Sequence, residues 1–482
     1  MSNIESAYNA ALDYLYSFVD YSLKHSSELA KADFNLDRMR ALMVELGSPE
    51  TSYPIIHVAG TKGKGSVSAL CASALKAAGY KVGLYTSPHL LDYTERIQIN
   101  GKPVSHVELV ELVEEVKPAV ARIPKLTTFE ITTALSFLAF ARRKVNAAVI
   151  EVGLGGRLDA TNVVTPKVSV ITSLSYDHMA VLGNTLALIA GEKAGIIKPG
   201  VPVVSAPQKD EALEVLERVA REKNALFTLV GKDVTYKPLN HSLDGQTLQL
   251  SAIGGQRSAF SLQPFDLVHL CMRHWRRQGK PSNPSTSSPV PAALAQAGQA
   301  LLTFKLPLLG LHQVENAAIA YAALKASGLE ISDEAIQKGF SEVKWPARFE
   351  VVRRDPPVIF DSAHNQDSFE KLTGALEDYF PGRPVYLIFG ASEDKNIPGM
   401  FAEIAPKVKL LLVTRADHPR ALEPEKIQGL ARQARLPNEA LASVEEAFIR
   451  ALEMSAKDGS IVLSAGSMFV TAEVMAAWNK LT

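Results

Sequence analysis

The 482-residue chain has little cysteine, no excess of charge of either sign and no long apolar run. Its two cysteines, Cys71 and Cys271, lie far apart, and neither has neighbours with the spacing of metal ligands. This pattern argues against a disulfide framework and favours reduced thiols. Lysine plus arginine and aspartate plus glutamate both number 51. Because the charges balance, we expect neither nucleic acid nor an anionic membrane as a partner.

Signals for export and membrane insertion are also missing. The apolar stretch 134–141 is far shorter than the ~20 residues that a membrane-spanning helix needs. The first residues lack the basic and then apolar order of a signal peptide. With 47% hydrophobic and 21% charged residues, a chain of this length is typical of a globular protein with two or three domains. We therefore expect a cytoplasmic monomer that acts on small molecules.

Short β-branched runs alternate with helical patterns in the first part of the chain. Such alternation predicts an α/β fold, in which βαβ units build a largely parallel sheet with helices on both faces. Two expected helices, 7–19 and 36–43, precede it. The expected strands are then 55–59, 82–86, 147–152, 168–173 and 201–205, and the expected helices are 66–78, 106–122, 127–143, 186–197 and 210–224.

A second alternation follows residue 346. After helices at 314–326 and 333–343, strands are expected at 358–360, 385–389, 410–413 and 461–463. We therefore expect two domains, a phosphate-loop sheet domain at 1–346 and a smaller Rossmann-like α/β domain at 347–482. The hinge between them is expected at 345–348.

The stretch 230–305 breaks the alternation, with one candidate strand at 248–253. Residues 254–300 are rich in proline and serine and read as a flexible insertion. The basic and aromatic run 273–277 within it fits a solvated surface better than a nucleic-acid contact.

A glycine-rich turn after the expected strand 55–59 has the features of a phosphate-binding loop. In Gly60-x-x-Gly63-Lys64-Gly65-Ser66, the glycines let backbone N–H groups approach oxygens, and Lys64 adds a charge at the start of a helix. Val58 stands where the strict pattern has its first glycine. The alternative is a plain strand-to-helix turn with Lys62 and Lys64 in solvent. The apolar strand before the turn argues against it, and we predict ATP binding.

Polar side chains also follow three other expected strands. Glu151 ends one of them, and a glycine-rich turn places Asp159 behind it. His178 follows a second strand and Ser87 a third. Ligands of parallel sheets bind at the carboxyl ends of the strands, and the phosphates of ATP need Mg²⁺. We predict a magnesium site there; the alternatives are a Glu151 that caps a neighbouring loop and a hydrogen-bonded loop histidine.

Two further groups carry chemistry. Lys193 lies in a helical pattern among apolar residues, and its spacing alone predicts a lysine whose ammonium reaches water past an apolar surface. Asp361 and His364 follow an expected strand of the second domain. If the two domains face each other, this acid and imidazole lie opposite the phosphates.

The order of these motifs resembles that of the folylpolyglutamate synthase/dihydrofolate synthase family of Mur-type ATP-dependent ligases. The resemblance covers nearly the whole chain apart from about 254–300, and the stretch 151–159 is specific to the folate branch. It implies that ATP, a pteroate or folate carboxylate and L-glutamate give ADP, phosphate and an amide through an acyl phosphate. The motifs that carry it lie at 60–66, 86–89, 151–159, 177–178, 192–195 and 361–365.

The resemblance also implies roles for individual residues. Catalytic roles fall to Lys193, Arg348, Asp361 and His364, of which Asp361 and His364 are linked to glutamate. ATP contacts fall to Thr61, Lys62, Gly63, Lys64, Gly65, Ser66, Asn316, Arg348 and Asp361. Pterin contacts fall to Thr127, Thr128, Phe129, Glu130, Leu158, Asp159 and Ala160. The metal ligands are Ser87, Glu151 and His178, together with Lys193 after its conversion to a carbamate.

The chain departs from the family pattern at two positions. Ala347 stands where the family usually has glycine, and Gln366 stands where it usually has proline. Two other functions stay open: a Mur-type cell-wall ligase, and a nucleotide-binding switch without ligation chemistry. The stretch 151–159 and the segment 127–130 disfavour the first, and the paired acids and imidazoles in both domains disfavour the second.

Overall fold

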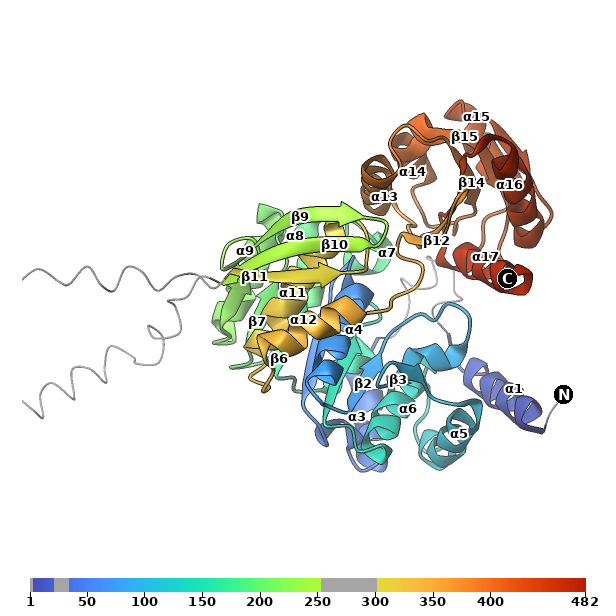
Figure 1. Cartoon of the computed structure of the whole chain (residues 1–482). Coiled ribbons are helices and arrows are strands. Elements are labelled where there is room, and N and C mark those ends of the chain that lie inside the picture. Colours follow the sequence, from blue (N-terminus) through green and yellow to red (C-terminus); the bar gives the residue numbers. More distant parts are fainter. Residues whose placement is uncertain (1–2, 21–33, 253–300) are drawn as a thin grey trace, which may run out of the picture.

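The computed structural model describes residues 3–20, 34–252 and 301–482 (Figure 1). The predicted insertion 254–300, with its run 273–277 and Cys271, lies outside the described residues. Figure 1 shows two lobes: an N-terminal lobe that ends with helix α12 (Asp333–Glu342), and a C-terminal lobe that begins with strand β12 (Glu350–Arg354). The predicted α/β class is confirmed in both.

The N-terminal lobe is built on an eight-stranded, mostly parallel sheet in the order β4-β3-β2-β5-β1-β6-β7-β8. β1 pairs in parallel with β5 and β6, whereas β3 pairs antiparallel with β2 and β4. The alternation does not predict β3, β4 and β8, because strands of two or three residues leave little pattern. The strands are β1 (Ile55–Ala59), β2 (Val82–Tyr85), β3 (Ile97–Ile99), β4 (Lys102–Pro103), β5 (Ala147–Glu151), β6 (Val168–Ile171), β7 (Val203–Ser205) and β8 (Phe227–Leu229).

Helices cover both faces of this sheet, as successive residues of β1 show. Ile56 and Val58 pack with α4, α11 and α12, while Ile55 packs with α1, α3, α5 and α6 on the other face. The predicted helix 7–19 is displaced to Asn3–Tyr16, because no stop signal marks its end. The helices are α1 (Asn3–Tyr16), α3 (Leu36–Glu45), α4 (Lys64–Ala77), α5 (His106–Val120), α6 (Thr128–Arg142), α7 (Met179–Leu182), α8 (Leu186–Ala194), α9 (Asp210–Glu222), α11 (Leu311–Ala326) and α12, with 3₁₀ turns at Pro49–Thr51, Tyr93–Arg96 and Ala160–Val163.

A separate three-stranded antiparallel sheet lies beside α11 and α12 (Figure 1). It consists of β9 (Val234–Ser242), β10 (Gly245–Ala252) and β11 (Leu301–Leu306), of which only part of β10 was predicted. Much of β9 is exposed, so it lacks the apolar run that marks a buried strand. The sheet bears on the site because Gln246 Nε2 donates to the carbonyls of Leu308 and Gly310 at the start of α11.

The C-terminal lobe is a six-stranded sheet in the order β12-β13-β17-β14-β15-β16, parallel except for β12. Two apolar clusters fill its faces, one with α13, α14 and α15 and the other with α16 and α17. Its elements are β12, β13 (Pro357–Phe360), α13 (Gln366–Tyr379), β14 (Val385–Phe389), α14 (Ile397–Ile404), a 3₁₀ turn at Ala405–Lys407, β15 (Val408–Val413), α15 (Pro424–Gln433), β16 (Asn438–Ala440), α16 (Val444–Asp458), β17 (Ile461–Ala465) and α17 (Met468–Leu481).

Both departures from the family pattern have a structural counterpart. Ala347 adopts a φ of 54°, a left-handed conformation that costs a non-glycine residue about 1 kcal/mol. Its N–H donates to Glu350 Oε2 at 2.8 Å, which stabilises the turn. Gln366 begins α13, a position where proline is also favourable, and its Nε2 donates to Glu403 Oε1 of α14 at 3.0 Å. The domain boundary at 346/347 stays a prediction.

The helices that the structure describes offer no candidate for a membrane span, because none is both long enough and apolar enough.

Candidate active site

A cleft of about 680 Å³ opens where the phosphate loop, the carboxyl ends of β1, β5 and β6, and the C-terminal lobe meet. It brings together all the site residues predicted from the sequence. They are Thr61, Lys62, Gly63, Lys64, Gly65, Ser66, Ser87, Thr127, Thr128, Phe129, Glu130, Glu151, Leu158, Asp159, Ala160, His178, Lys193, Asn316, Arg348, Asp361 and His364.

The phosphate loop requires glycine at Gly63. Its φ is +86°, and a Cβ there would lie 2.3 Å from Asn316 Oδ1, so α11 packs directly on the loop. α4 begins at the next residue, without a side-chain cap. The first N–H groups of any helix lack acceptors within the helix and carry the positive end of its dipole. The start of α4 therefore offers the cleft the donors that bind phosphate oxygens.

Gly63→Ala is expected to raise the KM for ATP about tenfold, because the new methyl group meets Asn316 and strains the left-handed turn. Steady-state kinetics with ATP as the varied substrate measure the change. Gly79 also has a positive φ, but no atom lies near its would-be Cβ. Gly79→Ala is therefore the control for strain alone, and an equal effect of both variants on KM would contradict the prediction.

Thr61 and Lys62 are more constrained than the loop motif suggests. Their N–H groups both donate to the carbonyl of Ser173, at 3.0 and 3.1 Å. Lys62 Nζ donates to Asp177 Oδ2 at 3.2 Å and lies 3.2 Å from His364 Nε2. The alternative of a solvated Lys62 is therefore wrong, because this lysine reaches across the cleft to the C-terminal lobe. Phosphate binding by Thr61 and Lys62 stays a prediction.

Asp177 joins the two lobes. Besides Lys62 it accepts hydrogen bonds from Lys395 Nζ at 2.9 Å and from Asn365 Nδ2 at 3.3 Å. Burial alone would raise the pKa of Asp177, but Lys62 and the other nearby cations hold it far below its ordinary value. The sequence interpretation missed Lys395, and it included Asn365 in the motif 361–365 without giving it a role. Lys395 follows the end of β14, so the rule that found Glu151 and His178 would also have pointed to it.

Lys193 is buried, with only 4% of its surface exposed, and its Nζ donates to the carbonyl of Gly60 at 2.9 Å. The predicted lysine with an ammonium in water is therefore wrong. Burial lowers the pKa of Lys193 to about 7, and the charge of Lys64 adds to this shift. Near neutral pH the amine is thus partly unprotonated, beside the entrance of the phosphate loop.

The predicted metal ligands lie at strand exits around the same cleft. Glu151 is buried at the end of β5, and its Oε2 accepts the N–H of Ser87 at 3.3 Å. Glu151 therefore also caps the neighbouring loop, as the alternative interpretation has it. Burial raises the pKa of Glu151, against the effect of Lys64. Burial lowers the pKa of His178 to about 4, which leaves a neutral imidazole. Within the described residues, no three His, Cys, Asp or Glu side chains gather as a metal cluster.

The first segment predicted to bind pterin, 127–130, packs against the turn that follows β5. A Cβ on Gly153 would lie 2.5 Å from the ring of Phe129, so the turn after β5 packs against α6. Thr127 and Glu130 form the capping box of α6, and Arg38 Nε donates to Glu130 Oε1 at 3.1 Å. These contacts also give this segment a structural role, and the pterin contacts of both segments stay predictions.

Arg348 and Asp361 approach the cleft from the linker and from the end of β13. Asp361 Oδ2 accepts the N–H of Phe349 and its Oδ1 accepts the N–H of Ala363, both at 2.7 Å. Burial raises the pKa of Asp361, and the Arg348 guanidinium counteracts it. Asp361 therefore fixes the linker turn as well as lining the cleft.

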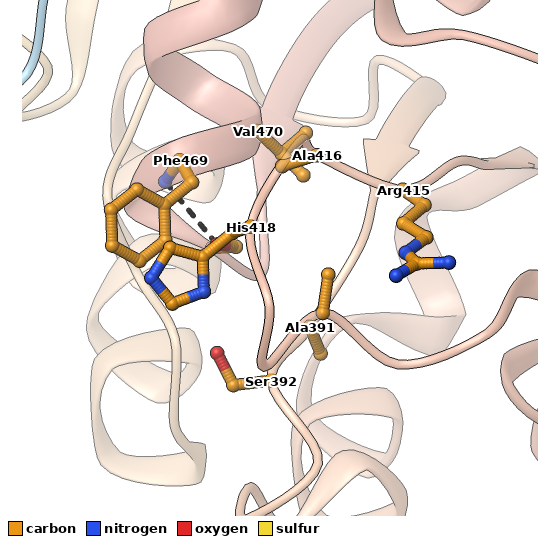
Figure 2. Close-up of a pocket in the computed structure, with 9 residues that line it drawn as sticks. Ala391, Ser392, Arg415, Ala416, His418, Phe469 and Val470 are labelled. Carbon is orange, nitrogen blue, oxygen red and sulfur yellow. Dashed lines mark hydrogen bonds between the residues drawn. The ribbon is translucent and has the colours of Figure 1, made fainter. Parts of the chain in front are cut away.

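A second cavity in the C-terminal lobe is too small for a substrate (Figure 2). Its volume is about 10 Å³, roughly the space of one water molecule. His418 stacks on Phe469 at its edge, with ring centroids 3.9 Å apart. This cavity carries no substrate chemistry.

The strand before the phosphate loop carries a fully buried histidine, His57. Burial, with a contribution from Lys198, lowers its pKa from 6.5 to about 3. Between these values the unfolded chain binds a proton that the folded chain does not, so stability falls as the pH falls. We expect the wild type to lose about 2 kcal/mol more than His57→Gln between pH 6.5 and about pH 5. Urea unfolding of both proteins at the two pH values measures the change in unfolding free energy. An equal loss in the wild type and in His57→Gln would contradict the prediction.

The arrangement of lobes, phosphate loop and buried lysines around one cleft is that of an ATP-dependent ligase of the Mur type. Residues 58–264 match the family described as Mur ligase middle domain. Residues 347–468 match the family described as Mur ligase, glutamate ligase domain.

Relatives narrow this class further. The chain is 34% identical over 449 residues to the dihydrofolate synthase/folylpolyglutamate synthase of Bacillus subtilis, covering 91% of this chain and 94% of the relative. It is 32% identical over 443 residues to the enzyme of that name from Escherichia coli, covering 92% and 91%. The chain therefore belongs to the dihydrofolate synthase/folylpolyglutamate synthase family.

Solved structures agree with this assignment. The Mycobacterium tuberculosis folylpolyglutamate synthase complexed with ADP superimposes with a TM-score of 0.81 at 30% identity, over 98% of both chains. The E. coli FolC in complex with DHPP and ADP gives a TM-score of 0.79 at 29% identity, again over 98% of both chains. The predicted resemblance and two-lobed ligase fold are confirmed, and these relatives favour the folate branch over a cell-wall ligase.

Proposed function

We propose that this enzyme uses ATP to join L-glutamate to dihydropteroate, to a reduced folate, or to both. One observation carries the proposal: a single cleft collects the phosphate loop, the pterin-like segments and the Asp361–His364 pair of the opposite lobe. Membership of the folate family supports it. The relatives that were solved with ADP, one of them also with DHPP, support nucleotide and acceptor in one site.

The reaction has two steps in this proposal. The acceptor carboxylate attacks the γ-phosphorus of ATP, the bond to the β-phosphate breaks, and ADP leaves. The amine of L-glutamate then attacks the acyl carbon, phosphate leaves, and the nitrogen loses its proton. Phosphoryl transfer depends mainly on positioning and charge neutralisation, and enclosure between two lobes keeps water from the acyl phosphate.

His364 lines the cleft as a neutral imidazole. Its Nδ1 lies 2.8 Å from the carbonyl of Ser362, so Nδ1 carries the proton and Nε2 presents a lone pair. The charge of Lys62 and burial hold the pKa of His364 well below its ordinary value, which keeps the ring neutral. Lys62 Nζ donates to Nε2 and occupies this lone pair, so the contact must open before His364 takes the proton of the amine.

The residues around Glu151 fit a magnesium ion. The cleft offers a buried carboxylate at Glu151, the hydroxyl of Ser87 and the neutral imidazole of His178, and oxygen donors are those that Mg²⁺ prefers. We propose these three as ligands, with Lys193 contributing as a carbamate. When bound, the ion would neutralise charge on the phosphate oxygens.

We also propose that the enzyme is a cytoplasmic monomer with domains at 1–346 and 347–482 and without a nucleic-acid partner. The balanced charge of 51 basic and 51 acidic residues supports the last point. The start of the second sheet at Glu350 supports the boundary.

The test is ADP release by the purified enzyme with ATP and Mg²⁺, with dihydropteroate or tetrahydrofolate as acceptor. Release should require both an acceptor and L-glutamate, and product analysis with each acceptor separates the two activities. A muramyl-peptide acceptor should give none. ATP turnover that ignores both substrates, or folate binding without ADP release, would overturn the proposal.

A further inference from the structure

A buried chain of hydrogen bonds connects the strand before the phosphate loop with the acceptor side of the cleft. His57 Nε2 of β1 lies 2.9 Å from Thr161 Oγ1, and Thr161 Oγ1 donates to Asp159 Oδ1 at 2.5 Å. His57 and Thr161 are fully buried, and Asp159 is 6% exposed. Of the three, only Asp159 lines the cleft. The chain thus links a group outside the site to one inside it.

The direction of this chain is fixed. Asp159 accepts at Oδ1, so the single hydroxyl proton of Thr161 is used there. Thr161 Oγ1 can then only accept from His57, which places the proton of the neutral imidazole on Nε2. His57 Nδ1 is buried and has no hydrogen-bond partner among the described residues, which is compatible with this tautomer because Nδ1 then carries no proton to donate.

The other contacts of Asp159 hold its carboxylate in one orientation. Oδ1 also accepts the N–H of Thr161 at 3.0 Å, and Oδ2 accepts the N–H of Leu154 at 2.9 Å. With every neighbour donating, the carboxylate remains an acceptor toward the cleft. A carboxylate held in this way is complementary to an N–H donor, and it disfavours a group that presents an acceptor there.

We propose that His57 is a positioning residue for the acceptor substrate: through Thr161 it orients Asp159 toward an N–H donor on the substrate's heteroaromatic ring. This inference rests on the proposed function, because it assigns Asp159 to the acceptor. Neither His57 nor Thr161 touches the substrate. Their effect is on the binding of the acceptor and not on the nucleotide or on phosphoryl transfer.

Three variants test the chain in the full-length enzyme. His57→Leu removes the donor, Thr161→Val removes the hydroxyl at nearly constant volume, and His57→Gln restores a donor. Tyr53→Phe is the matched control, because Tyr53 is buried in the same lobe, donates to the carbonyl of Phe137 at 3.1 Å and does not line the cleft. The KM for dihydropteroate or tetrahydrofolate, the KM for ATP and kcat are measured, together with Tm.

We expect the KM for the acceptor to rise at least about tenfold in His57→Leu and in Thr161→Val, as loss of one buried hydrogen bond implies. The KM for ATP and kcat should change less than about twofold, and His57→Gln should restore most of the affinity. Both residues act through one chain of hydrogen bonds. The acceptor KM of the double variant His57→Leu/Thr161→Val should therefore be no higher than that of the single variant with the larger effect.

An unchanged acceptor KM with a fall in Tm like that of Tyr53→Phe would show a structural histidine and overturn the inference. An equal rise in the KM for ATP would show distortion of the phosphate loop and would also overturn it. If His57→Leu fails to fold, the acceptor KM of Thr161→Val is compared with that of Thr161→Ser, which keeps the hydroxyl. Only Thr161→Val should then show the rise. A wild type that releases ADP without regard to the acceptor refutes the proposed function instead.

Discussion

Lys193→Met is expected to lower kcat by about 10²–10³-fold while the protein stays folded. Lys193 Nζ donates to the carbonyl of Gly60, at the point where β1 becomes the phosphate loop. Methionine has similar length but can neither donate there nor become a carboxylate. The measurement is kcat for acceptor-dependent ADP release, and full activity of this variant would show that Lys193 has no role in the reaction.

We expect Lys193→Met to raise the stability of the protein although it lowers kcat. Burial lowers the pKa of Lys193 in the folded protein from the ordinary 10.5 to about 7. Between these values the unfolded chain binds more protons, so the stability of the wild type rises with pH in this range. Lys193→Met should therefore be more stable than the wild type below pH 7, with an advantage that shrinks as the pH rises toward 10. Denaturant unfolding at pH 6.5 and 9.5 tests the sign.

Lys198 provides a matched control. Its Nζ also donates to a backbone carbonyl, that of Asn162 at 2.9 Å, and burial lowers its pKa to about 8, but it does not line the cleft. Lys198→Met should keep wild-type kcat. A loss of activity equal to that of Lys193→Met would mean that any partly buried lysine near the sheet has this effect.

The partly unprotonated amine of Lys193 also bears on the predicted carbamate. A neutral amine adds CO₂ and releases a proton, so a lysine with a pKa of about 7 reacts far more readily than one at 10.5. Activity of enzyme depleted of CO₂ should rise on addition of bicarbonate, and Lys193→Met should show no such rise. A wild type indifferent to bicarbonate would contradict the carbamate while leaving the role of the side chain intact.

The sheet that carries the site was predictable because its central strands are buried on both faces. Ile55–Ala59 is a strand in the structure with the predicted bounds, and Glu151 ends the neighbouring strand. A carboxylate at the end of a buried strand is costly without a partner, so it indicates a binding site. The residues at the ends of the strands therefore predicted the cleft. The exposed strand Val234–Ser242 has no such pattern, and the sequence interpretation missed it.

The directions of the lysines were not predictable, since they depend on contacts between distant parts of the chain. Lys62 belongs to the phosphate loop, but its partners are Asp177 and His364. Lys193 lies in a helix rich in apolar residues, yet its amine donates to the carbonyl of Gly60 at the end of β1. Local spacing describes which face of a helix a residue occupies, and only the packed fold determines what covers that face.

Asp177→Asn is expected to destabilise the protein by about 3–5 kcal/mol and to lower kcat at least about 100-fold. The substitution leaves Lys62 and Lys395 without the carboxylate that now lies 3.2 and 2.9 Å from their Nζ atoms, and all three side chains are at most 18% exposed. An amide accepts hydrogen bonds but carries no charge. Lys395 keeps Asp394, 3.4 Å from its Nζ, whereas Lys62 is left without a carboxylate among the ion pairs of the described residues. Because one cation belongs to each lobe, their repulsion opposes closure over the substrates.

A double variant tests whether the effect of Asp177→Asn on stability comes from the uncompensated charge of Lys395. Asp177→Asn/Lys395→Met removes one cation together with the carboxylate, so it should recover part of the stability lost in Asp177→Asn but little of kcat. Asp458→Asn is the control nearer the surface, because Asp458 pairs with an exposed Lys409 at 2.7 Å and an amide still accepts from Tyr386 and Ser460. It should leave kcat unchanged and cost far less stability than Asp177→Asn. Denaturant unfolding and acceptor-dependent ADP release measure the two effects. If Asp177→Asn behaves like Asp458→Asn, the contact of Asp177 with Lys395 contributes nothing to closure of the lobes.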